Sequence, residues 1–235
     1  MVVAFDTEDY ERNHDHLAEV GLCTWEPKTM RSITGIDCHG QPARQMGYTK
    51  DVGPHGEKLL ENMFFYHARV QENMHLINNK FCPGDPTACR NHSGQTRFLT
   101  VQETRRMLTD IFNWPIDPQR PDIGFCPVVI LGHAIMENDE SVLGKALGFS
   151  ISQLPNYVRT LDNQDLTPEM TSWRPPFLHP SNRIGLRALV GEVIGFNYEE
   201  HDPHTACNDT VLTVVCVLQM ALPDKYKVNQ PKTLD

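Results

Sequence analysis

The sequence predicts an α/β domain built on a mixed sheet of five or six strands, with helices on both faces. Three observations point to this class. The chain opens with an unbroken apolar run, a second strand pattern follows after a short link, and strand and helix patterns alternate from residue 100 onward. The short link favours an antiparallel first pair, whereas the later alternation is typical of parallel strands joined by helices.

Length, charge and cysteine content narrow the class further. At 235 residues the chain can bury a sizeable core, and it contains no apolar run of about 18 residues that would predict a membrane span. Its start lacks the basic and apolar segments of a secretory signal. A net charge of −9 argues against a broad basic face that coats long duplexes. Seven irregularly spaced cysteines favour a reducing, intracellular compartment, cytoplasmic or nuclear.

Four strands are expected from the apolar pattern. Residues 2–5 and 127–131 are continuously apolar, which is typical of strands buried on both faces. Residues 19–25 and 157–161 also fit strands, and the second of these ends at Asp162.

Four helices are expected as well. Thr100 and Glu103 have the spacing of a capping box, and the apolar stripe that follows runs to Phe112. A second helix follows Asp139 and closes at Gly148. The last two cover residues 184–194 and residues 210–222, where length favours a buried helix over a strand.

These elements predict one domain over residues 1–222, with a loop-rich insertion at about 30–98 and a polar C-terminal tail at 223–235. Within the insertion, at most one strand is expected near residues 31–38, and the period of residues 59–79 remains ambiguous. Residues 167–182 are expected to form a proline-rich connection. The chain enters a core strand at its second residue, as an excised domain of a longer protein would.

A zinc site is the alternative that the cysteines raise. Cys82, Cys89 and His92 lie within eleven residues, and Cys38, His39 or His75 could supply a fourth ligand. The spacing matches no common paired-cysteine motif, so we do not expect a structural zinc.

Acids recur where predicted elements end. Asp6 and Glu8 follow the first strand and point to the same side of it, Asp139 follows the strand at 127–131, and Asp209 precedes the last helix. The carboxyl ends of sheet strands converge, so these acids are expected to meet. Two carboxylates about 4 Å apart repel by roughly 4 kcal/mol at an effective dielectric near 20. Two hard divalent cations, Mg²⁺ or Mn²⁺, are the natural compensation.

These motifs resemble those of the DEDDh exonucleases of the RNase H-like superfamily. Asp6-Thr7-Glu8 matches the first motif, Gly132-His133 followed by Asp139 and Leu143 matches the middle one, and His204, Ala206 and Asp209 match the last. The detail is similar to a mainly fungal branch of that group, which shares the strand at residues 19–21 and the Asp162-x-Gln164 strand end.

The resemblance implies roles for these residues. Asp6 would bridge two metal ions, Glu8 and Asp209 would hold the ion that activates water, and Asp139 would support the second. His204 would be the general base. Thr7 and His133 would lie on the substrate side, although a strand-end histidine such as His133 also has a plain structural explanation.

Two departures from the family pattern leave alternatives open. One extra residue separates His133 from the acid of the middle motif, so Glu137 or Glu140 could replace Asp139. Thr210 stands where the family usually has alanine.

The function implied by the resemblance is a two-metal-ion 3′-to-5′ exonuclease. It would act on single-stranded or short RNA or DNA and release nucleoside monophosphates. The alternative is a catalytically inactive RNase H-like domain that serves as a binding or scaffold module.

Overall fold

The computed structural model describes residues 1–26, 52–53, 57–79, 90–136, 138–170, 183–191 and 195–221, and within these the side chains of 168–170 are left aside. Six strands form one sheet in the order β4-β3-β2-β1-β5-β6. Their bounds are β1 (Val2–Tyr10), β2 (Asn13–Trp25), β3 (Phe64–Val70), β4 (Thr96–Leu99), β5 (Val128–Gly132) and β6 (Tyr157–Asp162). The main helices are α3 (Val101–Phe112), α4 (Asp139–Leu147), α5 (Asn163–Met170) and α7 (Ala206–Ala221).

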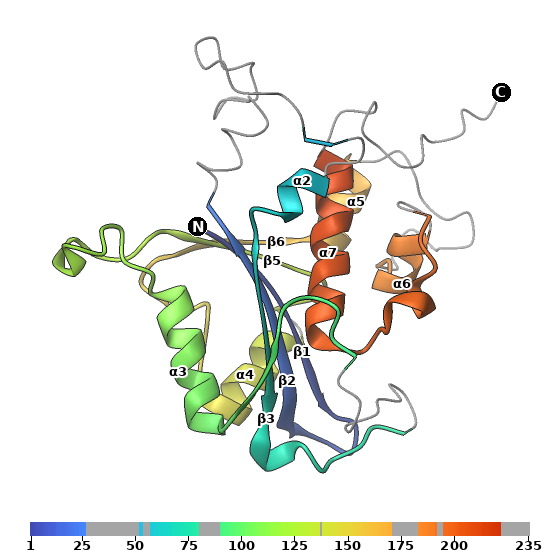
Figure 1. Ribbon diagram of the computed structural model, residues 1–235, viewed down its shortest axis with the longest axis horizontal. Coiled ribbons are helices and arrows are strands. Elements are labelled where there is room, and N and C mark those ends of the chain that lie inside the picture. The colour runs from blue at the N-terminus through green and yellow to red at the C-terminus, as the bar shows by residue number, and fades with distance from the viewer. Residues whose placement is uncertain are drawn as a thin grey trace, which may run out of the picture.

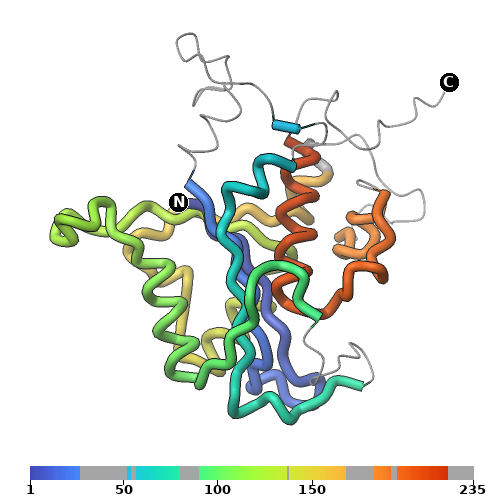
Figure 2. The backbone as a smooth tube through the Cα atoms, viewed as in Figure 1, coloured from blue at the N-terminus to red at the C-terminus, as the bar shows by residue number. Residues whose placement is uncertain are grey.

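The sheet is mixed, as the sequence predicts. β1 pairs with β2 and β2 with β3 in antiparallel fashion, whereas the pairs β1–β5, β5–β6 and β3–β4 are parallel. β1 and β2 form a long hairpin, and in Figure 2 the chain that follows β3 lies beside its tip. Asn78 holds the two together, since its Nδ2 donates to the carbonyl of Asp9 and its Oδ1 accepts from the N–H of Glu11.

Helices cover both faces of the sheet, which confirms the prediction. Figure 1 shows α7 on one side of the sheet and α3 with α4 on the other. Side chains alternate along β1, so Ala4 packs on the α7 side with Val214, and Phe5 packs on the opposite side with Phe112 and Leu143. Asp6 and Glu8 continue the alternation of Ala4 and therefore belong to the α7 side.

Local signals in the sequence explain where the helices begin and end. Thr100 and Glu103 form the expected capping box at the start of α3. Gly148 ends α4 in the left-handed conformation, with φ 59°, as expected. Gly21 of β2 allows α7 to approach the sheet, since a Cβ there would lie 2.3 Å from the backbone of Ala206.

Several predicted boundaries are wrong. The first two strands are longer than the predicted 2–5 and 19–25, because β1 runs to Tyr10 and β2 starts at Asn13. Two strands, β3 and β4, and the short helix α2 (Glu57–Leu60) come from the region that we expected to be rich in loops. The last helix begins at Ala206, so Asp209 lies inside it.

The two segments on either side of the proline-rich stretch also differ from expectation. The predicted connection at 167–182 starts as the end of α5, and the helix expected at 184–194 is the shorter α6 (Leu186–Leu189). The strand expected near residues 31–38 and the tail at 223–235 lie outside the described residues. Among the described helices, none combines the length and apolar character needed to cross a membrane.

Candidate active site

Asp6 and Glu8 lie where the central strand loses one of its neighbours. β5 pairs with β1 only from Val2 to Ala4, so the acids of β1 have β2 on one side and an open edge on the other. Both residues are half-buried. Within the described part of the chain, no hydrogen-bond donor or cationic side chain contacts either carboxylate directly. The strand therefore delivers two unneutralised acids to one place.

Asp139 fills the open edge from the first turn of α4. Its Oδ1 accepts hydrogen bonds from the backbone N–H and the hydroxyl of Thr7, each 2.7 Å long. Glu140 points elsewhere, because its carboxylate accepts from Ser150, the N–H of Ile151 and Ser152. Glu137 lies outside the described residues. Of the two acids that can be placed, Asp139 is the one beside the first motif.

Asp209 approaches the same place from α7. The helix rests directly on Gly21, which is the register partner of Asp6, and Asp209 lies one turn after Ala206 at that contact. Both of its carboxylate oxygens are engaged, since Oδ1 accepts from the hydroxyl of Tyr198 at 3.1 Å and Oδ2 from the N–H of His204 at 2.9 Å. Asp209 is thus buried and held in one orientation.

His204 lies beside these acids. Glu8, His204 and Asp209 each offer a ligand atom, and the three atoms lie within 4.8 Å of one another. The backbone of His204 is left-handed, with φ 62°. Partial burial lowers the pKa of its imidazole, an effect that nearby Glu199 opposes and Arg187 reinforces. The neutral ring is therefore favoured, which suits a proton acceptor.

Electrostatics shows that the four predicted acids form one cluster. Burial raises the pKa of Asp6 well above its usual range, and the charges of Asp139, Asp209 and Glu8 raise it further. The pKa of Glu8 rises for the same reasons, with Asp209 as its strongest charged neighbour.

The pKa values of Asp139 and Asp209, the two acids that lie on helices, are also raised, although hydrogen bonds lower them. Burial raises the pKa of Asp139 to about 7, although the bonds from Thr7 lower it. Burial likewise raises the pKa of Asp209 to about 6, against the bonds from His204 and Tyr198. Because the charge of Asp209 acts on both Asp6 and Glu8, the acid of α7 lies beside the acids of β1.

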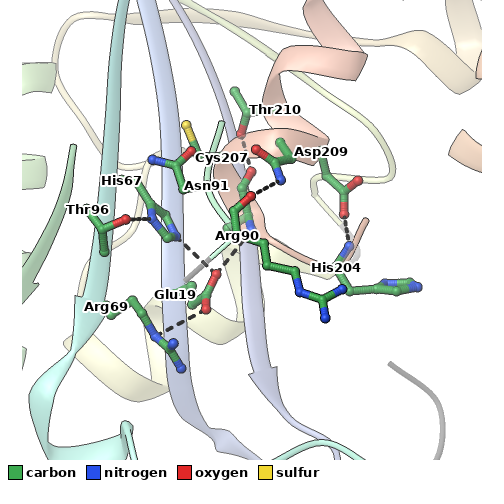
Figure 3. Close-up of polar contacts among 12 residues, drawn as sticks. Glu19, His67, Arg69, Arg90, Asn91, Thr96, His204, Cys207, Asp209 and Thr210 are labelled. Atoms are coloured by element: carbon green, nitrogen blue, oxygen red, sulfur yellow. Dashed lines mark hydrogen bonds and ion pairs between the residues drawn. The ribbon is translucent and has the colours of Figure 1, made fainter. Parts of the chain in front are cut away.

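A fifth acid, Glu19, was not identified from the sequence as part of this site. It is the register partner of Glu8 on β2 and lies on the same face of the sheet. Its Oε1 lies 3.3 Å from Nε of Arg69, and its Oε2 lies 3.0 Å from Nε2 of His67 and 3.3 Å from the N–H of Ala206. Figure 3 shows Glu19 between the two basic side chains of β3.

Tyr198 was also missed, because it lies in the acidic turn before the last motif, in the 3₁₀ helix η4 (Tyr198–His201). Of these two missed residues, only Glu19 lies at a position that the sequence could have indicated. In an antiparallel hairpin with a short link, an acid on the second strand is expected to face one on the first.

The two predicted substrate-side residues have structural partners. Thr7 holds Asp139, as described above, and His133 Nδ1 lies 3.1 Å from Oδ1 of Asn163, with Gln164 at its other nitrogen. Their roles in substrate binding stay predictions. Of the zinc alternative, His75 and His92 are described: His75 is exposed, and Nε2 of His92 lies 2.6 Å from Oδ2 of Asp202. Cys38, His39, Cys82 and Cys89 lie outside the described residues.

The donor set suits hard divalent cations. It consists mainly of carboxylate oxygens, which Mg²⁺ and Mn²⁺ prefer. The pKa values of Asp6 and Glu8 are raised first by burial and then by the charges of neighbouring acids, so the ionised cluster is short of positive charge. A bound cation would supply that charge.

Comparison with known proteins shows the family to which the chain belongs. The family model described as DEDDh_C, the C-terminal domain of DNA polymerase III subunit epsilon-like proteins, matches residues 1–220. The chain therefore belongs to this DEDDh family, and the RNase H-like α/β class is confirmed. The narrower resemblance to a mainly fungal branch stays a prediction. No curated protein matches the chain in sequence.

Solved structures of exonuclease I from E. coli are similar to the chain. A zinc-bound complex with single-stranded DNA is 13% identical, with a TM-score of 0.47, over 92% of this chain and 39% of that one. A complex with a 5cy-dT13 oligonucleotide is 12% identical, with a TM-score of 0.47, over 96% of this chain and 42% of that one. The chain thus spans about two fifths of the length of exonuclease I.

Proposed function

We propose that this chain is a metal-dependent 3′-to-5′ exonuclease. It hydrolyses terminal phosphodiester bonds of single-stranded or short RNA or DNA and releases nucleoside monophosphates. The observation that carries the proposal is the gathering of Asp6, Glu8, Asp139 and Asp209 into one cluster with His204 beside it. Membership of the DEDDh family supports it.

The residues divide the chemistry among them. Asp6, Glu8, Asp139 and Asp209 would hold two Mg²⁺ or Mn²⁺ ions, which supply positive charge to the attacking and leaving oxygens of a phosphodiester. His204 takes the proton from the attacking water, since its imidazole is neutral and its nitrogen lies near Glu8 and Asp209. Thr7 keeps Asp139 in place through its two hydrogen bonds.

The net charge of −9 bears on the substrate. A protein with this charge lacks the broad basic surface that long duplexes require, so a short or single-stranded end is the better substrate. The intracellular location and the domain bounds of 1–222 stay predictions.

The cost of the acidic cluster argues against an inactive scaffold. Every raised pKa in the cluster means that the ionised form is less stable in the folded chain than in the unfolded chain. A binding module that never used the site would retain that cost without a benefit.

The test is a digestion assay on RNA and DNA oligonucleotides that carry a label at either end, with and without Mn²⁺. We expect stepwise shortening from the 3′ end only when Mn²⁺ or Mg²⁺ is present. Asp6→Ala and His204→Ala should abolish it. Asp110→Ala is the matched control, because Asp110 is an exposed acid on α3 that is paired loosely with Arg106.

The proposal fails if neither nucleic acid is digested under any metal condition. The assignment of residues fails if Asp6→Ala digests the oligonucleotide as fast as the parent protein does. Shortening from the 5′ end would overturn the direction alone.

A further inference from the structure

Tyr198 contacts two site residues without belonging to any of the three motifs. Its hydroxyl donates a hydrogen bond to Oδ1 of Asp209, 3.1 Å away. Its ring meets the imidazole of His204 edge to face, with centroids 6.2 Å apart and planes at 88°. One side chain therefore touches both the metal-binding acid of α7 and the general base.

The ring of Tyr198 is a fixed support. Only 8% of the residue is exposed. It belongs to a small apolar cluster between α6 and α7, whose other buried members are Ile184, Leu189, Val190, Leu212 and Cys216.

The segment that carries His204 needs such a support. Asp202 and His204 both have left-handed backbones, with φ values of 46° and 62°. Non-glycine residues in this region are strained and persist where the surroundings hold them. His204 is held at two points, through its N–H on Asp209 and through its ring on Tyr198.

We propose that Tyr198 is a positioning residue of the active site: its hydroxyl orients the carboxylate of Asp209 for a metal ion, and its ring orients the imidazole of His204. The proposal rests on the proposed exonuclease function for its second half. Its first half concerns metal binding alone. Residues that orient a metal ligand in this way typically contribute about 10- to 100-fold to metal affinity or activity.

Tyr198→Phe tests the role of the hydroxyl separately from the role of the ring, because it removes the hydroxyl and keeps the ring. We expect the affinity for Mn²⁺, measured by isothermal titration calorimetry, to fall by roughly 10-fold. At saturating Mn²⁺, kcat on a labelled oligonucleotide should stay within about threefold of the parent value. The matched control is Tyr157→Phe, which removes a hydroxyl paired with Thr160 on β6. It should leave the affinity unchanged.

Tyr198→Leu tests the ring. We expect kcat at saturating Mn²⁺ to fall by about 10-fold or more below that of Tyr198→Phe, because His204 loses its aromatic neighbour. KM should change little, because Tyr198 is only 8% exposed and acts through Asp209 and His204. Rescue of kcat by phenylalanine, but not by leucine, is a pattern that a role in folding alone would not give.

Two results would overturn the proposal. One is a Tyr198→Phe protein that binds Mn²⁺ as tightly as the parent, and the other is an equal loss of affinity in Tyr157→Phe. If the parent protein digests no oligonucleotide, the proposed function fails, yet the calorimetric comparison still decides whether Tyr198 orients Asp209.

Discussion

Glu8 and Glu19 face each other across the β1–β2 hairpin, yet their surroundings are opposite. Glu19 is paired with Arg69 and His67 and accepts from the first turn of α7. Glu8 lies among Asp209 and other acids, and burial together with their charges raises its pKa. The same residue type on the same face of one sheet thus serves two purposes.

The difference lies in what each acid stabilises. The carboxylate of Glu19 completes the fold, because it joins β2, β3 and the N-terminal end of α7, where a negative charge is favourable. Glu8 weakens the metal-free fold, and in the proposed function a divalent cation would be its partner. We call Glu19, His67 and Arg69 the supporting half of this polar group, because they stabilise the fold. Glu8 and the acids around it form the active half, to which the proposed function assigns the chemistry.

The largest expected effect is the difference in activity and stability between variants of Asp6 and of Glu19. Asp6→Asn should lower nucleotide release by roughly 1,000-fold or more, since it removes a ligand shared by the proposed metal ions. It should also stabilise the metal-free protein by about 1 kcal/mol, because it removes one charge from a cluster of acids. Glu19→Gln should do the reverse and destabilise the fold while retaining measurable activity. Urea unfolding and the oligonucleotide assay measure the two effects.

Asp110→Asn provides the control for a surface acid and should change neither quantity. The comparison breaks down if Glu19→Gln stabilises the metal-free protein as Asp6→Asn does. Both acids would then belong to the same strained cluster.

Arg69→Met should give the next largest effect, on stability. The Arg69 side chain is 5% exposed, and its removal leaves the Glu19 carboxylate without its cationic partner. Breaking such a buried pair typically costs about 3–5 kcal/mol. The double variant with Glu19→Gln should recover part of this loss, which a double-mutant cycle in urea would detect. Simple additivity of the two losses would show that the residues are not coupled.

The sequence was sufficient to place the acids of the active half. Asp6 and Glu8 follow a continuous apolar run, and the helix boundaries at Thr100 and Gly148 carry capping signals, so these local patterns agree with the final fold. The rule that strand ends converge did not by itself bring Asp139 and Asp209 to Asp6, because both acids lie on helices, and the expectation also used the resemblance to the DEDDh exonucleases.

The supporting half could not be predicted, because its residues carry no sequence motif and come together only through the pairing of β2 with β3. His67 and Arg69 lie on β3, whose mixture of aromatic and polar residues has no clear period. β4 is only four residues long and gains its place through pairing with β3. Tyr198 depends on the packing of α6 against α7, which no short motif records.

Acidification should stabilise the metal-free protein through the acidic cluster. The folded pKa values of Asp139 and Asp209 are raised to about 7 and about 6, so the folded protein binds more protons than the unfolded chain between about pH 4 and 7. The stability of the metal-free protein should therefore rise as the pH falls from 7.5 to 5.5. Calorimetry without metal, and again with Mn²⁺, measures this trend.

Saturating Mn²⁺ should reduce or reverse that trend, because the ion competes with protons for the same carboxylates. At about 100 times its dissociation constant, a ligand adds about 2.7 kcal/mol, and each kcal/mol raises the melting temperature by about 2–4 °C in a chain of this size. A metal-free protein that loses stability on acidification through this range would contradict the proposed cluster.

The smallest effect concerns Asp139 and Glu140, neighbours on α4 that repeat the contrast between Glu8 and Glu19. Partial burial alone would raise the pKa of Glu140, but hydrogen bonds from Ser150, Ser152 and the N–H of Ile151 lower it overall. Glu140→Gln should cost about 1 kcal/mol of stability at neutral pH and leave nucleotide release intact.

A lowered folded pKa means that Glu140 stabilises the fold above its unfolded pKa, and that this contribution is lost as the pH falls through the folded value. The difference between the parent and Glu140→Gln in urea unfolding should therefore shrink on acidification. Asp139→Asn should behave in the opposite way, with activity lost and the metal-free fold stabilised, because burial raises its pKa. If Glu140→Gln abolished nucleotide release and Asp139→Asn did not, Glu140 would be the acid of the middle motif.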